Sequence, residues 1–308
     1  MNDLKHLGLI LDSGLSFEKH LNEKVIKAQK NLGLIKDLSK YLPLKTLDQM
    51  YKSLVRPHLN YCDIIYHAPS QVNQPPLGLT LTPLMEKVER IQYQAALAVT
   101  GTWQGSSRTK LYEELGWENF SDRRRCRRIL QVHKIENGRT PSYLKDKLPT
   151  HHRRQDGSAL NTFNQLQSRT NRYTKSFFPD AIDSWNIFIS HFNNMPTFDT
   201  FNTHITSFFR PKTKKIFGIH DPLGIRYLFQ LRVNLSPLRS HKKRYNFIDT
   251  PSDICHCKQD VENTCHFLLK CPFYAIHRAT LAASVIQILQ KNNLNHLGNQ
   301  VQLYLIWA

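Results

Sequence analysis

Acidic residues are scarce in this sequence. Across 308 residues, 24 Asp and Glu stand against 42 Lys and Arg, which leaves a formal net charge of +18. Such an excess repels itself in the folded state and is most simply neutralised by a polyanionic partner. The composition therefore favours RNA or DNA as the partner, with an ordinary soluble basic protein as the plainer alternative.

Long apolar runs are also missing. Residues 1–12 alternate in charge without an apolar core of signal-peptide length, and no later stretch approaches about eighteen uninterrupted apolar residues. The sequence thus predicts a nuclear or cytoplasmic protein that does not contact a membrane. Because residues 7–12 indicate a buried strand closed by a turn, we also expect further chain upstream of Met1.

Motifs for common small-molecule chemistry are lacking as well. No glycine-rich phosphate loop occurs in the sequence. Gly105-Ser106-Ser107 lacks the strand-to-helix setting of a nucleophile elbow, so a serine hydrolase is not supported. No small-molecule substrate is evident.

Apolar residues recur at helical spacing in much of the chain. Each series follows three- and four-residue steps, which is typical of amphipathic helices with one inward face. Pro57 ends or kinks the second of them. The series are Leu21, Val25, Ala28, Leu32, Ile35 and Leu38; Leu47, Met50, Tyr51 and Leu54; Val88, Ile91, Ala95 and Val99; Ala181, Trp185, Phe188, Ile189 and Phe192; and Leu281, Val285, Ile288 and Leu289.

Basic residues gather in two regions. Residues 100–180 hold sixteen Lys and Arg against eight acids, and residues 205–250 hold ten against Asp221 and Asp249. The stretch 150–172 has little apolar periodicity and is interpreted as a loop or hairpin. We expect these regions to neutralise phosphates. The predicted contacts are Arg123, Arg124, Arg125, Arg127, Arg128, Arg153, Arg154, Arg169, Arg172, Arg239, Lys242, Lys243 and Arg244.

Four of the six cysteines crowd into seventeen residues near the C-terminus. Cys255, Cys257 and Cys271, with His266, supply three thiolates and one imidazole, the ligand set of structural tetrahedral zinc. The single residue between Cys255 and Cys257 is a tight spacing, so His256 or Cys265 remain alternative ligands. A group of reduced thiols in an ordinary loop is the plainer interpretation. Isolated histidines such as His58 and His133 are interpreted as surface or core residues.

A series of short motifs runs through the chain in a distinctive order. It ends at the cysteine cluster with His266-Phe267-Leu268-Leu269 and Cys271-Pro272. Before it come His6–Asp12 with Leu15-Ser16-Phe17, Lys52–Leu59 leading to Tyr66, Leu111–Trp117, Asp122–Arg124, Ser176–Pro179 leading to Trp185-Asn186, and Leu235–His241.

This series resembles the C-terminal half of the reverse transcriptases of non-LTR (LINE-type) retrotransposons, over nearly the whole chain. The resemblance implies that His6–Asp12 corresponds to the primer-grip strand after the palm, and Lys52–Tyr66 to the thumb. It further implies that the C-terminal region holds template RNA or target DNA.

The chain departs from those enzymes in its chemistry. An RNA-directed DNA polymerase needs paired carboxylates that hold two divalent metals, and no Tyr-x-Asp-Asp string occurs here. Asp12 is explained by its turn-forming neighbours Ser13 and Gly14. We therefore expect no catalytic residue, structural zinc as the cofactor, and magnesium only in a missing catalytic region.

The apolar spacing and the resemblance together predict a mainly α fold. It comprises a short N-terminal β-hairpin, a thumb-like helical bundle, a basic helical middle region and a small C-terminal zinc knuckle. The predicted parts are a primer-grip hairpin with thumb-like helices at 1–67, a linker at 68–83, a basic helical region at 84–149, a basic loop and helical connecting region at 150–250, and the zinc knuckle with a C-terminal helix at 251–308.

Three functions remain open from the sequence. The first is a nucleic-acid-binding C-terminal fragment without catalysis. The second is the thumb portion of an active polymerase, which works when joined to its palm in an upstream polymerase region. The third is a decayed element fragment with no activity.

Overall fold

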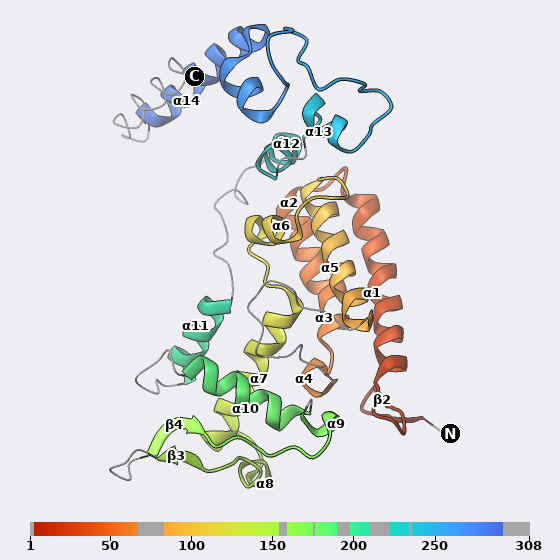
Figure 1. The fold of residues 1–308 in the computed structure, drawn as a ribbon, viewed down its shortest axis with the longest axis vertical. Coiled ribbons are helices and arrows are strands. Elements are labelled where there is room, and N and C mark those ends of the chain that lie inside the picture. Colours follow the sequence, from red (N-terminus) through yellow and green to blue (C-terminus); the bar gives the residue numbers. More distant parts are fainter. Residues whose placement is uncertain are drawn as a thin grey trace. The chain divides into compact units, whose positions relative to one another are not determined.

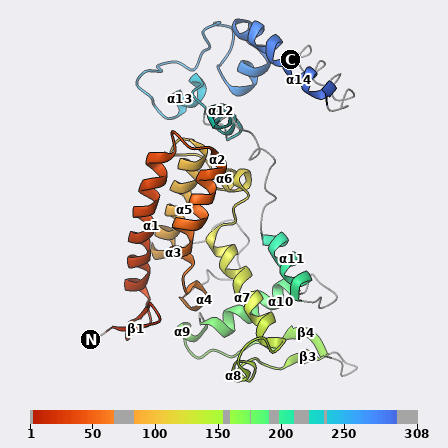
Figure 2. The same cartoon turned by 180° about the vertical axis from the view of Figure 1, so that it is seen from behind.

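The computed structural model describes residues 3–66, 83–153, 159–174, 176–189, 198–209, 222–233 and 236–291. This part of the chain is mainly helical with two small two-stranded sheets, as predicted (Figure 1, and from behind in Figure 2). The chain divides into a first unit, residues 1–99 and 108–222, and a second unit, residues 100–107 and 223–308. The linker predicted at 68–83 lies, apart from Pro83, outside the described residues.

The N-terminal hairpin has a tight two-residue turn. β1 (Leu4–His6) pairs antiparallel with β2 (Leu9–Leu11), and His6 lies opposite Leu9. Leu7 and Gly8 between them have φ values of 46° and 80°, the signs of a type I′ turn. The hairpin is confirmed, but the apolar run from Leu7 is not one continuous strand, because Gly8 lets the backbone reverse there.

Asp12 closes this hairpin region by accepting hydrogen bonds from the chain that follows it. Its carboxylate accepts from the backbone N–H of Ser16 at 3.0 Å and of Phe17 at 2.9 Å. These contacts lower the pKa of Asp12, the backbone bond from Ser16 most of all. Asp12 therefore has a structural role in holding the chain that leads into the first helix.

Two long helices of the first unit follow the predicted apolar spacing. In α1 (Glu18–Leu38) and α5 (Pro83–Thr100), the inward residues recur every three or four positions and are almost fully buried. Side chains at these steps share one helix face, which explains why the pattern predicted them. The buried residues are Leu21, Val25, Ala28, Leu32 and Ile35 in α1, and Val88, Ile91, Ala95 and Val99 in α5.

Pro57 does not end the next helical stretch. α2 (Leu44–Met50) continues through a π-helical turn, η1 (Tyr51–Val55), into α3 (Arg56–Asn60). Proline has no backbone N–H and its ring crowds the preceding turn. The wider turn directly before Pro57 accommodates this crowding.

A second core of the first unit forms around Trp185. α7 (Phe120–Glu136), α10 (Phe177–Ile189) and α11 (Phe198–Phe209) pack beside the hairpin of β3 (His151–Arg153) and β4 (Ala159–Phe163). The Trp185 indole N–H donates to the Asn161 carbonyl at 2.9 Å. The predicted hairpin and core stripe are confirmed, while Phe192 lies outside the described residues.

The shorter helices of the first unit are α4 (Asp63–Tyr66), α6 (Arg108–Leu115), α8 (Ser142–Lys145) and α9 (Asn171–Thr174).

His133 is a core residue of this cluster, as expected for a histidine without ligand-spaced partners. It is buried, and its ring stacks on Phe201 with centroids 4.2 Å apart.

Among the helices that the structure describes, none has the combination of length and apolar character that crossing a membrane requires.

Glu89 gives the first unit a pH-dependent stability. Its carboxylate is buried and accepts from the Phe120 backbone N–H at 2.6 Å and the Tyr112 hydroxyl at 3.3 Å. Burial raises the pKa of Glu89 in spite of these bonds. A raised folded-state pKa stabilises the fold below the unfolded pKa of about 4.3, and this contribution disappears as the pH rises through the folded value.

We therefore expect Glu89→Gln to increase the free energy of unfolding at pH 7, by about 1.4 kcal/mol for each unit of pKa difference. At pH 4 the substitution changes little, because the folded wild-type carboxyl is already protonated. Urea denaturation at the two pH values measures both effects. A larger loss of stability at pH 7 than at pH 4 contradicts the expectation.

The second unit joins a short early segment to the C-terminal region. It contains α12 (Pro222–Arg232), α13 (Arg239–Arg244), the π-helical η3 (His266–Lys270), the 3-10 turn η4 (Pro272–Tyr274) and α14 (Ala275–Lys291). The Gly101 carbonyl accepts from the Gln230 side chain at 2.7 Å, and the Trp103 ring lies 5.2 Å from that of Phe247. Residues 100–107 are thereby held against the later chain.

The final helix is present, but its predicted packing is partly wrong. Leu281 is 57% exposed, whereas the sequence pattern placed it inward. The helix is anchored at its beginning, where Arg278 donates to the Cys271 carbonyl at 2.6 Å. Leu281 lies beyond this anchored first turn. The side chains of Ile288 and Leu289 lie outside the described part.

Candidate metal centre

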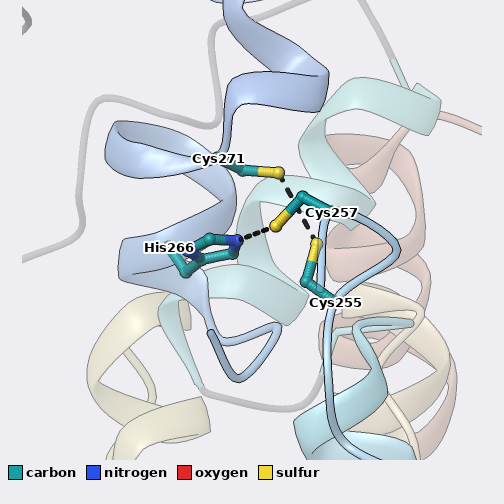
Figure 3. Close-up of side chains that lie close together, drawn as sticks. All are labelled: Cys255, Cys257, His266 and Cys271. Carbon is teal, nitrogen blue, oxygen red and sulfur yellow. Dashed lines mark hydrogen bonds between the residues drawn. The ribbon is translucent and has the colours of Figure 1, made fainter. Parts of the chain in front are cut away.

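Four side chains from two segments of the second unit converge on one point. The ligand atoms of Cys255, Cys257, His266 and Cys271 all lie within 4.8 Å of one another. Cys257 Sγ is 3.1 Å from His266 Nε2, and Cys255 Sγ is 3.5 Å from Cys271 Sγ. Figure 3 shows the three sulfur atoms and the imidazole turned toward a common centre. We call residues 254–271 the knuckle.

The dimensions of this cluster fit a tetrahedral metal ion. Zinc–sulfur bonds of about 2.3 Å place the sulfurs of a tetrahedral site about 3.8 Å apart. The observed separation of 3.5 Å between the Cys255 and Cys271 sulfurs lies near that value, and all four ligand atoms lie within 4.8 Å of one another. The four residues can therefore hold one metal ion with only small adjustments.

The first pair of ligands lies on a tight turn. Ile254 and Val261 form an antiparallel bridge, and the Cys255 N–H donates to the Asp260 carbonyl at 2.9 Å. The Cys255 carbonyl accepts from the Lys258 N–H at 2.9 Å, and Lys258 has a φ of 63°. This reversal permits two ligands separated by one residue to serve the same centre.

The second pair depends on a wide helical turn. In an α-helix of 3.6 residues per turn, positions five apart differ by about 140° around the axis. In η3 the turn is π-helical, and the Cys271 N–H donates to the His266 carbonyl at 2.7 Å. This wider turn brings Cys271 back to the side of His266. The Asn263 side chain caps its start by accepting from the His266 N–H at 2.8 Å.

Burial and hydrogen bonding give the two neighbouring thiols different pKa values. Burial raises the pKa of Cys255 to about 11. Burial acts in the same direction on Cys257, but hydrogen bonds from the Gln259 backbone and from His266 outweigh it and lower the pKa of Cys257 to about 7. Cys257 is therefore the thiol most readily converted to the thiolate, the form that binds metals.

The remaining imidazole nitrogen faces an acid. His266 Nδ1 lies 3.9 Å from the Asp260 carboxylate, while Nε2 points to the cluster. An acid beside the far nitrogen of a histidine ligand helps to orient its ring. The ring is thus already turned in the direction that metal binding needs.

The two alternative ligands lie outside the cluster. His256 is exposed and its Nε2 is 3.4 Å from an Arg239 guanidinium nitrogen. Cys265 is also exposed. The structure therefore brings together the four residues that the sequence favoured.

The knuckle packs on the basic helix α13 through Glu262, which sequence reasoning missed. The buried Glu262 carboxylate accepts from the Arg239 N–H at 3.2 Å, and its carbonyl accepts from the Ser240 hydroxyl at 2.8 Å. Arg239 also donates to the Ser252 carbonyl at 3.2 Å. No sequence pattern marks Glu262, whereas Asn263 three residues before His266 is a recognisable helix cap.

The prediction of phosphate contacts is wrong for Arg124 and Arg128. Their exposed fractions are 1% and 0%. Arg128 pairs with the buried Asp180 and donates to the Ile64 carbonyl at 2.7 Å, and Arg124 Nε lies 3.9 Å from Asp63. Both guanidinium groups are occupied inside the first unit, so they do not face a nucleic acid.

The neighbouring arginines of α7 are only partly available. Arg123 pairs with Glu118, and Arg127 pairs with Asp63 at 2.5 Å. Arg125 is half-buried. Helix α7 therefore uses much of its positive charge for internal ion pairs.

The other predicted contacts differ in their exposure. Arg169 is exposed, as are Lys243 and Arg244, while Arg239 and Lys242 are half-buried and Lys242 pairs with Asp249 at 2.8 Å. Arg154 and the side chains of Arg153 and Arg172 lie outside the described part of the chain.

Comparison with known proteins gives no family assignment. No protein-family model, curated protein or solved structure matches this chain. The metal-capable Cys3His cluster and the distribution of basic residues are therefore the observations on which a function rests.

Proposed function

We propose that this chain binds nucleic acid through its basic surface and holds one structural zinc ion in the knuckle. The observation that carries the proposal is the metal-capable Cys3His cluster, packed directly on the basic helix α13. A net charge of +18 supplies the long-range attraction to a polyanion. The knuckle would keep α13 and its exposed Lys243 and Arg244 in place.

Zinc is the ion that this donor set favours. Thiolates and imidazole suit zinc, whereas magnesium and calcium prefer oxygen ligands. Four protein ligands fill a tetrahedral shell and leave no open position for a substrate. The role proposed for the ion is therefore to fix the knuckle and not to catalyse a reaction.

The ordered motifs support a more specific proposal, that the chain is a C-terminal part of a non-LTR retrotransposon reverse transcriptase. In that role it holds template RNA or target DNA for a polymerase whose catalytic carboxylates are not in this sequence. The hairpin of β1 and β2 and the helices α1–α4 would then serve as primer grip and thumb.

Salt dependence tests the binding proposal. If about six phosphates of duplex DNA are neutralised, log K falls with log salt with a slope of about −5, because each contact releases condensed counterions. Fluorescence anisotropy of a labelled duplex between 50 and 200 mM salt measures this slope. A binding constant that does not change with salt contradicts the proposal.

A further inference from the structure

A pocket opens where α13 meets the knuckle. Its volume is about 600 Å³, within the range of small-molecule and nucleotide sites. One part of its lining comes from α13 and the other from the chain around His266. The lining includes Ser240, Lys243, Arg244, Asp253, Thr264 and Cys265.

The two cations of this pocket have donors to spare. Lys243 donates one hydrogen bond to the Pro251 carbonyl at 2.7 Å, and a lysine ammonium carries three protons. Arg244 is exposed, and no ion pair joins it to an acid among the described residues. Both groups can therefore bind a phosphate by charge-assisted hydrogen bonds.

One further residue of the lining favours an occupant with more than a phosphate. Asp253 belongs to the lining, and its carboxylate repels a bare anion but can accept from N–H groups. The lining thus suits a ligand that combines an anion with N–H donors.

We propose that this pocket receives one nucleotide unit of a single-stranded nucleic acid. Lys243 and Arg244 hold its phosphate, while Asp253 accepts from the amino edge of an unpaired base. A paired base within a duplex cannot enter a concave site without leaving its stack, whereas a single strand presents its bases freely. The inference rests on the proposed function and specifies the place and kind of contact.

The knuckle would make this pocket depend on the metal. Val261, Asn263, Thr264 and Cys265 belong to the pocket lining and lie between the two pairs of metal ligands. Without the ion these residues lose the restraint that holds them beside α13. Strand binding at the pocket should therefore require the loaded knuckle.

The test compares two double variants of the full, zinc-loaded chain. Lys243→Gln with Arg244→Gln removes the pocket cations, and Lys27→Gln with Lys30→Gln removes two exposed cations of α1 outside the lining. Each single-strand phosphate contact contributes about 0.7 to the salt slope. Because the two cations hold one phosphate, the pocket variant should lose about 0.7 of the slope and about 5-fold in affinity at 0.1 M salt, while the control keeps both.

The reactivity of Cys265 measures directly whether the pocket is occupied, because its exposed thiol lines the pocket. A cytosine-rich 12-mer should slow alkylation of Cys265 by iodoacetamide in proportion to the fraction of chain bound, and inorganic phosphate at equal ionic strength should not. Asp253→Asn should reduce the preference for a cytosine strand over a uracil strand. Peptide mass spectrometry locates the alkylated thiol.

The outcomes separate this inference from the proposed function. If the strand binds with the expected salt dependence but both double variants weaken it equally and Cys265 stays reactive, the pocket assignment is overturned and general binding stands. Equal protection by inorganic phosphate also overturns the nucleotide assignment. Absence of strand binding by the wild-type chain overturns both.

Discussion

Cys257→Ser and His266→Ala should each abolish tight zinc binding, whereas the wild-type chain retains one zinc ion. Each substitution removes one of four ligands whose atoms lie within 4.8 Å of one another. A tetrahedral structural site that loses a ligand exchanges a protein donor for water and loses most of its affinity. Metal analysis after gel filtration under reducing conditions gives the ratio of zinc to protein.

Cys265→Ser provides the matched control. It makes the same chemical change as Cys257→Ser, in a neighbouring thiol that is exposed and outside the cluster. This variant should still carry one zinc ion. The metal centre is contradicted if wild type purifies without zinc, or if Cys257→Ser and Cys265→Ser retain zinc equally.

Removing the ion should also unfold the knuckle. A segment of about twenty residues cannot bury a hydrophobic core, and metal binding contributes about 10–16 kcal/mol to folding in isolated zinc-finger peptides. Chelation should therefore accelerate amide hydrogen exchange across residues 254–271. Exchange in α1 and α5 should not change, because their buried apolar faces need no metal.

The helices were predictable because burial imposes a period on the sequence. α1, α5 and α10 bury the residues that recur every three or four positions, and this spacing follows from the helix geometry alone. The turn at Leu7 was not predictable from the apolar run. The apolar pattern there also suits a continuous strand, but Gly8 allows a left-handed backbone and the chain turns instead.

The candidate metal ligands were predictable as a set, but their arrangement was not. Clustered thiols with one imidazole indicate a metal by their chemistry, whatever the backbone does. The left-handed backbone of Lys258 and the π-helical turn of η3 allow side chains at this sequence spacing to meet at one point. Neither feature has a sequence signature. The choice between Cys257 and Cys265 therefore required the fold.

The inward arginines show where charge patterns mislead. A run of arginines on a helix is usually interpreted as a solvent-facing surface, and the acids that pair with them are distant in sequence. Phe120, Arg124, Arg128 and Val132 nevertheless follow four-residue steps and form one buried stripe of α7. That spacing was the sequence signal for the burial of these arginines. Their acidic partners, Asp63 and Asp180, could not be identified from the sequence because only the tertiary fold brings them together.

Asp180→Ala is accordingly expected to destabilise the first unit by about 3–5 kcal/mol, the usual cost of removing one partner from a buried ion pair. It leaves Arg128 buried without its acidic partner, although Arg128 still donates to the Ile64 carbonyl at 2.7 Å. Asp183→Ala on the same helix is the control, because Asp183 forms no ion pair within the described residues; it should change stability by less than about 1 kcal/mol. Urea denaturation followed by Trp fluorescence measures both.

The double variant Arg128→Met with Asp180→Leu should be far less destabilised than Asp180→Ala. Burial raises the pKa of Asp180 and lowers the pKa of Arg128 in spite of their mutual attraction, so desolvation outweighs the pairing for both groups. Replacing both charges with apolar side chains removes that desolvation cost and leaves no unpaired charge. If the double variant is as unstable as Asp180→Ala, the ion pair itself stabilises the fold; if all three retain wild-type stability, Arg128 is not buried as described.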